Sequence, residues 1–157
     1  MSTQDDLAAA FWSHLASDRI VMLATDGAPP RPMAALLKDG AGPVHFFTAA
    51  DTDLGEALAS GNARTATMTF QAKGQDLWAS VTGTLTMPND PQTIDALWSP
   101  MTAAWFEGGR DDPSLRLLRL DLHEGEVWED VSALAVALKG LTGGTVDASD
   151  KKGHVPL

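Results

Sequence analysis

The chain has 157 residues, including 21 acidic and 11 basic side chains, a formal net charge of −10 and no cysteine. This length suits one domain with a single hydrophobic core, so we expect one domain over residues 1–157. The charge argues against nucleic acid and anionic membranes as partners, and the lack of cysteine excludes disulfides and thiolate sites. No apolar run approaches the roughly 18 residues of a membrane span, and the acidic start lacks the basic region of a secretory signal, so the expected location is cytoplasmic.

The first segment has the apolar spacing of an amphipathic helix. Leu7, Phe11 and Leu15 recur every four residues, and Asp5 and Asp6 suit the positive end of the helix dipole. We expect this helix to cover the end of a barrel and to bury its aromatic side chains.

Residues 20–38 predict two neighbouring strands. Ile20–Thr25 is rich in β-forming residues and ends at Asp26-Gly27, a dipeptide that suits a hairpin turn. Arg31–Lys38 follows, and Pro32 removes one backbone donor near its start, which indicates an edge position or a bulge. An edge strand leaves backbone groups free for a ligand.

A third strand and a short helix come next. A turn at Asp39-Gly40 leads into the strand Val44–Thr48, and Gly61 is expected to end the helix that follows. The candidate N-caps of this helix are Asp51, Thr52 and Asp53.

The middle of the chain predicts two antiparallel strands and a broken helix. Arg64–Phe70 alternates threonine with apolar residues, and Leu77–Met87 alternates likewise, with Gly83 marking a bulge or a close backbone approach. Asp90-Pro91 begins a helix that pauses near Pro100 and resumes toward Phe106.

The last third predicts two strands, Leu115–Leu122 and Glu126–Glu129, separated by a turn at His123–Gly125. A last helix is expected over Ala133–Leu141, and residues 142–157 are expected to form a surface tail. Six to seven strands with short helices and no regular β-α-β alternation indicate a mainly β fold with α additions, an antiparallel barrel.

The side chains suggest no catalyst that works without a cofactor, and the catalytic residues stay unknown. The four histidines are scattered and show no H-x-x-x-H spacing, so no metal site is expected. Neither a G-x-S-x-G nucleophile motif nor a phosphate-binding G-x-x-x-x-G-K motif is present. Asp111 and Asp112 fit a capped turn better than a pair of catalytic carboxylates.

Several short motifs together resemble one known family. In chain order they are Leu23–Gly27 (LATDG), Arg31–Met33 (RPM), Phe46–Thr48 (FFT), Trp98–Met101 (WSPM), Trp105-Phe106, Gly108–Pro113 (GGRDDP) and Val127–Glu129 (VWE). They resemble the pyridoxamine 5'-phosphate oxidase-like split β-barrels that bind FMN, and the general stress protein 26 branch in particular. The resemblance runs from about Leu7 to the C-terminus and implies an antiparallel split β-barrel of six to seven strands.

The resemblance also implies a cofactor site. The family holds FMN at a homodimer interface, and a flavin would carry the redox chemistry that the side chains do not supply. Positions that match the family's cofactor-binding residues are Arg31, Pro32, Met33, Ala34, Phe47, Thr48, Thr52, Asp53, Leu54, Trp98 and Trp105. The implied function is that of a small FMN-dependent oxidoreductase or a stress-related flavoprotein, with enzymatic activity left open.

Two positions depart from the family pattern. Where relatives carry one or two basic residues for the FMN phosphate, this chain has Asp53 and Leu54. A phosphate carries about −1.5 to −2 charges, so Asp53 should repel it unless Arg31 or the helix N-terminus compensates. A split barrel without flavin, or one that binds a deazaflavin or a tetrapyrrole, is therefore the alternative. If FMN binds in the family's pose, Leu54→Lys is expected to tighten it.

Overall fold

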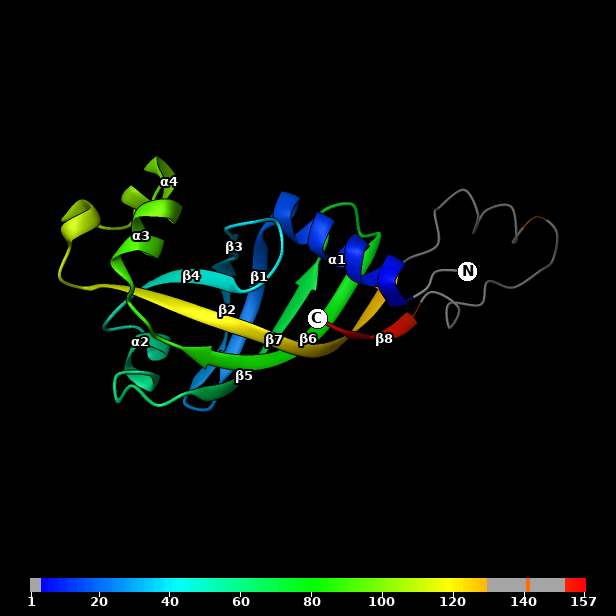
Figure 1. Cartoon of the computed structure of the whole chain (residues 1–157), viewed down its shortest axis with the longest axis horizontal. Coiled ribbons are helices and arrows are strands. Elements are labelled where there is room, and N and C mark those ends of the chain that lie inside the picture. The colour runs from blue at the N-terminus through cyan, green and yellow to red at the C-terminus, as the bar shows by residue number, and fades with distance from the viewer. Residues whose placement is uncertain (1–3, 130–140, 142–151) are drawn as a thin grey trace.

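The computed structural model describes residues 4–129, 141 and 152–157, and the strands in these residues form one curled antiparallel sheet (Figure 1). Its eight strands pair in the order β2-β1-β5-β6-β7-β4-β3, and β8 pairs with β7. The strands are β1 Ile20–Thr25, β2 Ala28–Ala34, β3 Leu36–Leu37, β4 Val44–Ala49, β5 Arg64–Gln71, β6 Leu77–Thr86, β7 Leu115–Glu129 and β8 Lys152–Pro156. The predicted mainly β fold with α additions is confirmed, and the sheet curls into the half-barrel of a split β-barrel.

The two edges of the sheet meet because a single residue links β2 to β3. These strands lie at opposite ends of the strand order. Between them, the amide of Ala35 donates to the carbonyl of Arg19, 2.7 Å away. The prediction of one strand over Arg31–Lys38 is therefore wrong, since the chain passes at Ala35 from pairing with β1 to pairing with β4. Of the two alternatives for Pro32, the edge position is confirmed, because β2 pairs only with β1 among the described strands.

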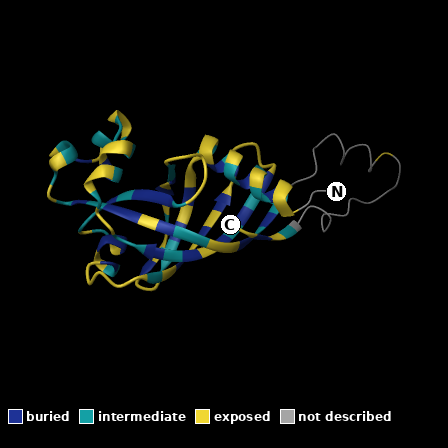
Figure 2. Ribbon diagram, viewed as in Figure 1, coloured by how far each residue is buried: buried dark blue, intermediate teal, exposed yellow. Residues whose placement is uncertain are grey.

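Helix α1, Gln4–Asp18, covers the end of the half-barrel where β8 lies. Its buried residues are Leu7, Phe11 and Leu15, as their spacing predicted. The ring of Phe11 stacks on Phe70 of β5, with ring centroids 6.3 Å apart. Figure 2 shows further buried positions along the strands of the sheet, and these residues join the helix row in the main core.

A β-bulge interrupts the pairing of β6 with β7. Thr82 pairs with Glu124 and Gly83 pairs with Leu122, so His123 is the extra residue on β7. A Cβ atom on Gly83 would overlap the carbonyl oxygen of Asp121, so the predicted bulge and close backbone approach at this glycine are both confirmed.

The predicted turn at His123–Gly125 is wrong, and β7 is one strand of 15 residues in place of two shorter ones. The bulge absorbs His123, while β6 and β8 pair with Glu124 and Gly125 from either side and hold them extended.

The end of the chain is part of the sheet. The prediction of a surface tail over residues 142–157 is wrong for Lys152–Pro156, which forms β8 with Val155 buried. The amide of Leu157 then donates to the carbonyl of His123 at 3.1 Å. Residues 142–151, and the predicted helix Ala133–Leu141 apart from its last residue, fall outside the described residues. The addition of β8 raises the number of strands above the predicted six to seven.

Two short helices and a turn form a second layer at the opposite end. Helix α3, Pro91–Leu97, begins after the N-cap Asp90, and α4, Pro100–Ala103, begins after the N-cap Ser99. The break at Pro100 is therefore confirmed, and a 3-10 turn, η1 Gly109–Asp111, follows. These elements enclose a small core of Ile94, Phe106, Leu115 and Leu117. No helix within the described ranges is long and apolar enough to span a membrane.

Candidate functional site

Two unpaired strand edges face each other across the split in the barrel. Within the described chain, β3 pairs only with Val44 and His45 of β4, which leaves Phe46–Thr48 without a strand partner on that side. The free edge of β2 includes Arg31–Met33, and β2 contacts β4. Helix α2, Asp53–Ala57, contacts both strands. We call Arg31–Met33 and Phe46–Thr48 the seam. Within the described residues each run pairs with a strand on one side only, β1 or β7, so the backbone groups that point to the other side are free to bind the polar edge of a flat ligand.

The predicted site residues of β2 divide between the two faces of the sheet. Arg31 and Met33 pair with Leu23 and Val21, which lie in the main core, so both face the inside of the half-barrel. Pro32 and Ala34 lie between and after them, are exposed, and face outward. A ligand on one face of β2 can therefore contact the side chains of either Arg31 and Met33 or Pro32 and Ala34. It can contact the other two residues only through their backbone.

The same division occurs in β4. Thr48 is buried and lies two residues after Phe46, a member of the main core. Phe47 points to the opposite face, where it packs against the second core. The structure therefore does not bring the side chains of Phe47 and Thr48 together.

The turn from β4 into α2 is closed by two threonine hydroxyls. Thr52 is the N-cap: its Oγ1 accepts from the amide of Gly55 at 3.1 Å and donates to the carbonyl of Ala49 at 2.8 Å. Because that donation uses the single proton of Thr52, Thr48 is the donor in the 2.7 Å contact between the two hydroxyls. Both protons are committed within the protein, and neither is left for a ligand phosphate.

The two positions that depart from the family pattern behave differently. Asp53 is exposed at the start of α2, so its carboxylate faces solvent beside the turn. Leu54 has 0% of its side chain exposed and belongs to the main core. The expectation that Leu54→Lys tightens FMN needs correction, because the new ammonium group would replace a buried apolar side chain.

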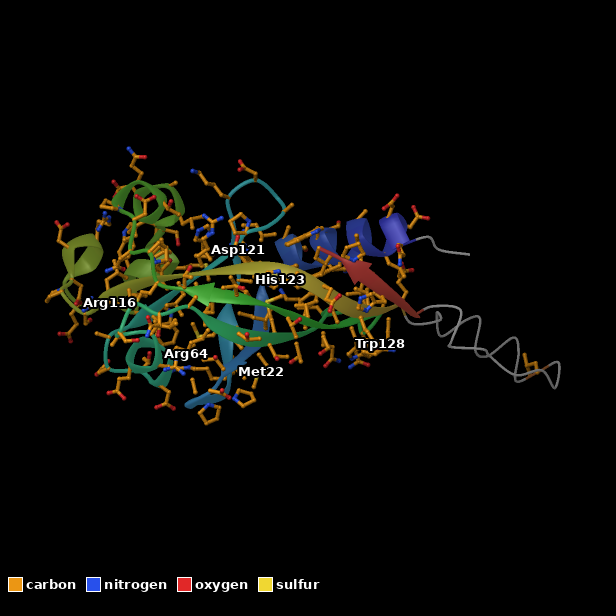
Figure 3. The ribbon with its side chains drawn as sticks, turned by 60° about the horizontal axis from the view of Figure 1, so that its bottom comes forward. Met22, Arg64, Arg116, Asp121, His123 and Trp128 are labelled. Carbon is orange, nitrogen blue, oxygen red and sulfur yellow. The ribbon has the colours of Figure 1, made fainter. Side chains whose placement is uncertain are left out.

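Sequence reasoning missed two arginines at the α2 end of the half-barrel. Arg64 pairs with Leu85, a core residue, and Arg116 pairs with Thr48, so both face inward as Arg31 does. Figure 3 shows Arg64 and Arg116 at the end where α2 lies. Strand alternation gave a signal for one of them, since Arg116 lies two residues before the buried Leu118.

An aromatic cluster covers the outer face of β4. Trp98, which follows α3, meets Phe47 edge to face with ring centroids 5.8 Å apart, and its ring lies 6.2 Å from that of Phe106. Trp105 is 85% exposed and Met101, four residues earlier, is 77% exposed. The structure thus places Trp98 against the seam strand β4 but leaves Trp105 on the surface.

The carboxylates near η1 act as turn caps. Asp112 accepts hydrogen bonds from the amide of Gly108 at 2.9 Å and from the amide and hydroxyl of Ser114 at 2.8 and 2.7 Å. The bonds from Ser114, followed by that from Gly108, lower the pKa of Asp112. The prediction of a capped turn in place of a catalytic carboxylate pair is confirmed for Asp112.

His45 is the titratable side chain most enclosed by the fold. It is 5% exposed, and its Nδ1 has no hydrogen-bond partner. Burial, followed by the positive charge of Arg119 in the neighbouring strand, lowers the pKa of its imidazole, so the ring is held neutral. His45 lies on the same face of β4 as Phe47, away from the threonine turn. Elsewhere in the described ranges, no three histidine, aspartate or glutamate side chains gather as metal ligands.

The fold, the seam and the aromatic cluster define a split-barrel protein of the pyridoxamine 5'-phosphate oxidase class. A family model described as "Pyridoxamine 5'-phosphate oxidase like" matches residues 6–149, and the chain belongs to this family. A comparison with curated proteins gave no match.

Solved structures agree with this family. A general stress FMN/FAD binding protein from Xanthomonas citri is 43% identical, with a TM-score of 0.77 over 82% of this chain and 92% of that one. A general stress family protein from Xanthomonas campestris pv. campestris is 42% identical, with a TM-score of 0.77 over 85% and 93%. A general stress protein 26 from Jannaschia sp. CCS1 is 31% identical, with a TM-score of 0.84 over 99% and 100%. The predicted resemblance to the general stress protein 26 branch is confirmed.

Proposed function

We propose that the chain is a flavin-binding protein and that FMN is its cofactor. The observation that carries this proposal is the seam, where Arg31–Met33 and Phe46–Thr48 each keep one unpaired strand edge, beside the aromatic cluster of Phe47 and Trp98. The pyrimidine edge of an isoalloxazine needs backbone donors and acceptors, and its ring needs an apolar wall. The Xanthomonas citri relative is described as an FMN/FAD binding protein, which supports the same ligand class.

The residues present fit the flavin ring better than they fit its phosphate. The seam offers one unpaired strand edge on each side for the polar edge of the ring. At the α2 turn, however, the hydroxyl protons of Thr48 and Thr52 are already used and Asp53 carries a negative charge. Any phosphate contact must therefore come from a cation elsewhere on the chain.

When bound, FMN would supply electron or hydride transfer, and we infer a small oxidoreductase or stress-related role on this basis. The protein's part would be to hold the ring at the seam and to keep water from one of its faces. Trp98 and Phe47 already form an apolar surface beside β4 for that purpose.

We also propose a homodimer in the cytoplasm. Met101 on α4 and Trp105 just after it both expose large apolar side chains, and such exposure suits an interface. Sedimentation equilibrium is expected to give about twice the chain mass of 16.6 kDa. A monomer at all concentrations would contradict a shared interface.

The deciding experiment is a visible spectrum of the purified protein, followed by titration with FMN. Binding is expected to shift and sharpen the flavin absorption bands and to change its fluorescence. A cofactor is expected to bind with a dissociation constant of roughly a micromolar. If the flavin spectrum stays unperturbed at several hundred micromolar protein, binding is far weaker than that and the proposal is wrong.

The second candidate is a split barrel that has lost its phosphate clamp and binds a deazaflavin, a tetrapyrrole or no cofactor. It is favoured by one observation, the acidic Asp53 beside a turn whose hydroxyl protons are internally bonded. The same titration with a deazaflavin and with haem separates the candidates, because this alternative expects one of these two ligands to bind more tightly than FMN, or none of the three to bind.

A further inference from the structure

Arg116 lies on β7 beside the turn that leads from β4 into α2. In the β4–β7 register it lies opposite Thr48, and paired residues share a face of the sheet. The amide of Ala50 also donates to the carbonyl of Ser114 at 2.8 Å, which fixes the turn against the chain that leads into Arg116. The side chain of Arg116 therefore leaves β7 on the inner face, next to the turn that holds Thr52.

The guanidinium of Arg116 keeps donors for an anion. Its Nη1 donates to the carbonyls of Pro113 and Leu115, at 2.9 and 2.8 Å, which are neutral partners on its own strand and the loop before it. Arginine has five N–H donors, so the Nε and Nη2 hydrogens remain. Among the described residues no carboxylate pairs with Arg116.

Two other arginines provide the contrast. Arg110 pairs with Asp95 at 2.6 Å, and Arg119 pairs with Asp121 at 3.0 Å. Arg119 lies three residues after Arg116 on the same strand, but on the outer face. In a chain with a formal net charge of −10, an arginine held beside a turn without a carboxylate partner is available to a ligand anion.

We propose that Arg116 binds the phosphate of the flavin, in place of the basic residues that Asp53 and Leu54 do not supply. This inference rests on the proposed flavin function. A guanidinium can hold a phosphate through two parallel hydrogen bonds, and its positive charge offsets the repulsion from Asp53. Arg31 and Arg64 face the same side and add to the positive potential there. Arg64 is itself engaged, since its Nε donates to the carbonyl of Ala57 at 2.7 Å.

The test compares FMN with riboflavin, which lacks the phosphate. Wild type, Arg116→Met, Arg116→Lys and Arg119→Met are each titrated with both flavins by fluorescence. Arg116→Met is expected to weaken FMN binding by about tenfold to 150-fold, the value of one charge-assisted hydrogen bond, and to leave riboflavin binding unchanged. Arg116→Lys keeps the charge and is expected to retain a clear preference for FMN. Arg119→Met, the matched control from the outer face, is expected to bind both flavins as wild type does.

The outcomes separate the two claims. If wild type binds both flavins and Arg116→Met retains full FMN affinity, the assignment of Arg116 is overturned while the flavin function stands. Equal loss of FMN and riboflavin in Arg116→Met, with FMN preference also lost in Arg116→Lys, likewise overturns it and gives Arg116 a structural role. If wild type binds neither flavin, the proposed function fails first. Competition by millimolar inorganic phosphate against FMN but not riboflavin, present in wild type and absent in Arg116→Met, would support the assignment independently.

Discussion

The two ends of the half-barrel are closed by different chemistry. At the α1 end, Phe11 is fully buried, and its ring stacks between Trp12 and Phe70, with ring centroids 5.0 and 6.3 Å away. At the α2 end, two threonine hydroxyls bond to each other, and Arg64 and Arg116 face inward without carboxylate partners among the described residues. The first end is closed by apolar packing, whereas the second is closed by polar side chains that hydrogen-bond within the protein.

The largest loss of stability is expected at the α1 end, where Phe11→Ala removes the stacked ring. Because the side chain is fully enclosed, we expect the free energy of unfolding to fall by about 3–5 kcal/mol. Urea denaturation followed by tryptophan fluorescence measures this loss. A fall below about 1 kcal/mol, the range typical of half-exposed sites, would show that α1 does not seal the core.

The α2 end can be tested at two neighbouring positions that differ in burial. Leu54→Lys is expected to destabilise the fold by at least about 2 kcal/mol, because a buried apolar side chain is replaced by an ammonium group. Asp53→Lys is the matched control, and its exposed side chain should change stability by no more than about 0.5 kcal/mol. Similar unfolding midpoints for the two variants in one urea series would contradict the burial of Leu54.

The threonine turn is expected to contribute less. Thr52→Ala removes the N-cap of α2 and leaves the hydroxyl of Thr48 without its acceptor, so we expect a loss of about 1 kcal/mol. The unfolding midpoint in urea reports it. Thr52→Ser keeps the cap oxygen and should restore most of the loss. A serine variant as unstable as the alanine variant would mean that the methyl group, and not the hydroxyl, matters at this position.

The smallest effect on stability is expected at Trp105, just after α4. Trp105→Ser changes an exposed side chain, so the unfolding free energy of the protein should stay within about 0.5 kcal/mol. If Trp105 lies in the proposed dimer interface, the same variant lowers the dimer fraction in sedimentation. An unchanged dimer would place the interface elsewhere on the chain.

Local patterns in the sequence predicted most of the elements. The i, i+4 row of Leu7, Phe11 and Leu15 indicated α1, and Asp90-Pro91 indicated the start of α3, because helix periodicity and capping depend only on near neighbours. Gly83 also indicated a bulge or a close backbone approach, since glycine inside a strand weakens it unless the local geometry requires a missing side chain. The family motifs extended these local predictions to the split-barrel fold.

Local sequence patterns could not predict which strands pair with each other. Arg31–Lys38 looks like one strand in sequence, yet it divides at Ala35, because the second half pairs with a strand at the other edge of the sheet. The glycine at position 125 suggested a turn, but the strands on both sides keep it extended. Lys152–Pro156, which looked like part of a surface tail in sequence, is a strand because it pairs with β7.

By itself, therefore, the sequence determined most of the helices and strands, which of their faces are apolar, and which family the chain resembles. Only the tertiary structure decided that Leu54 is buried, that Phe47 and Thr48 serve opposite faces, and that Arg116 lies beside the turn where the family's basic residues are missing. The physical reason is that periodicity and capping are encoded within a few residues. The pairing of β4 with β7 joins residues about 70 positions apart, and such contacts form only when the whole sheet closes.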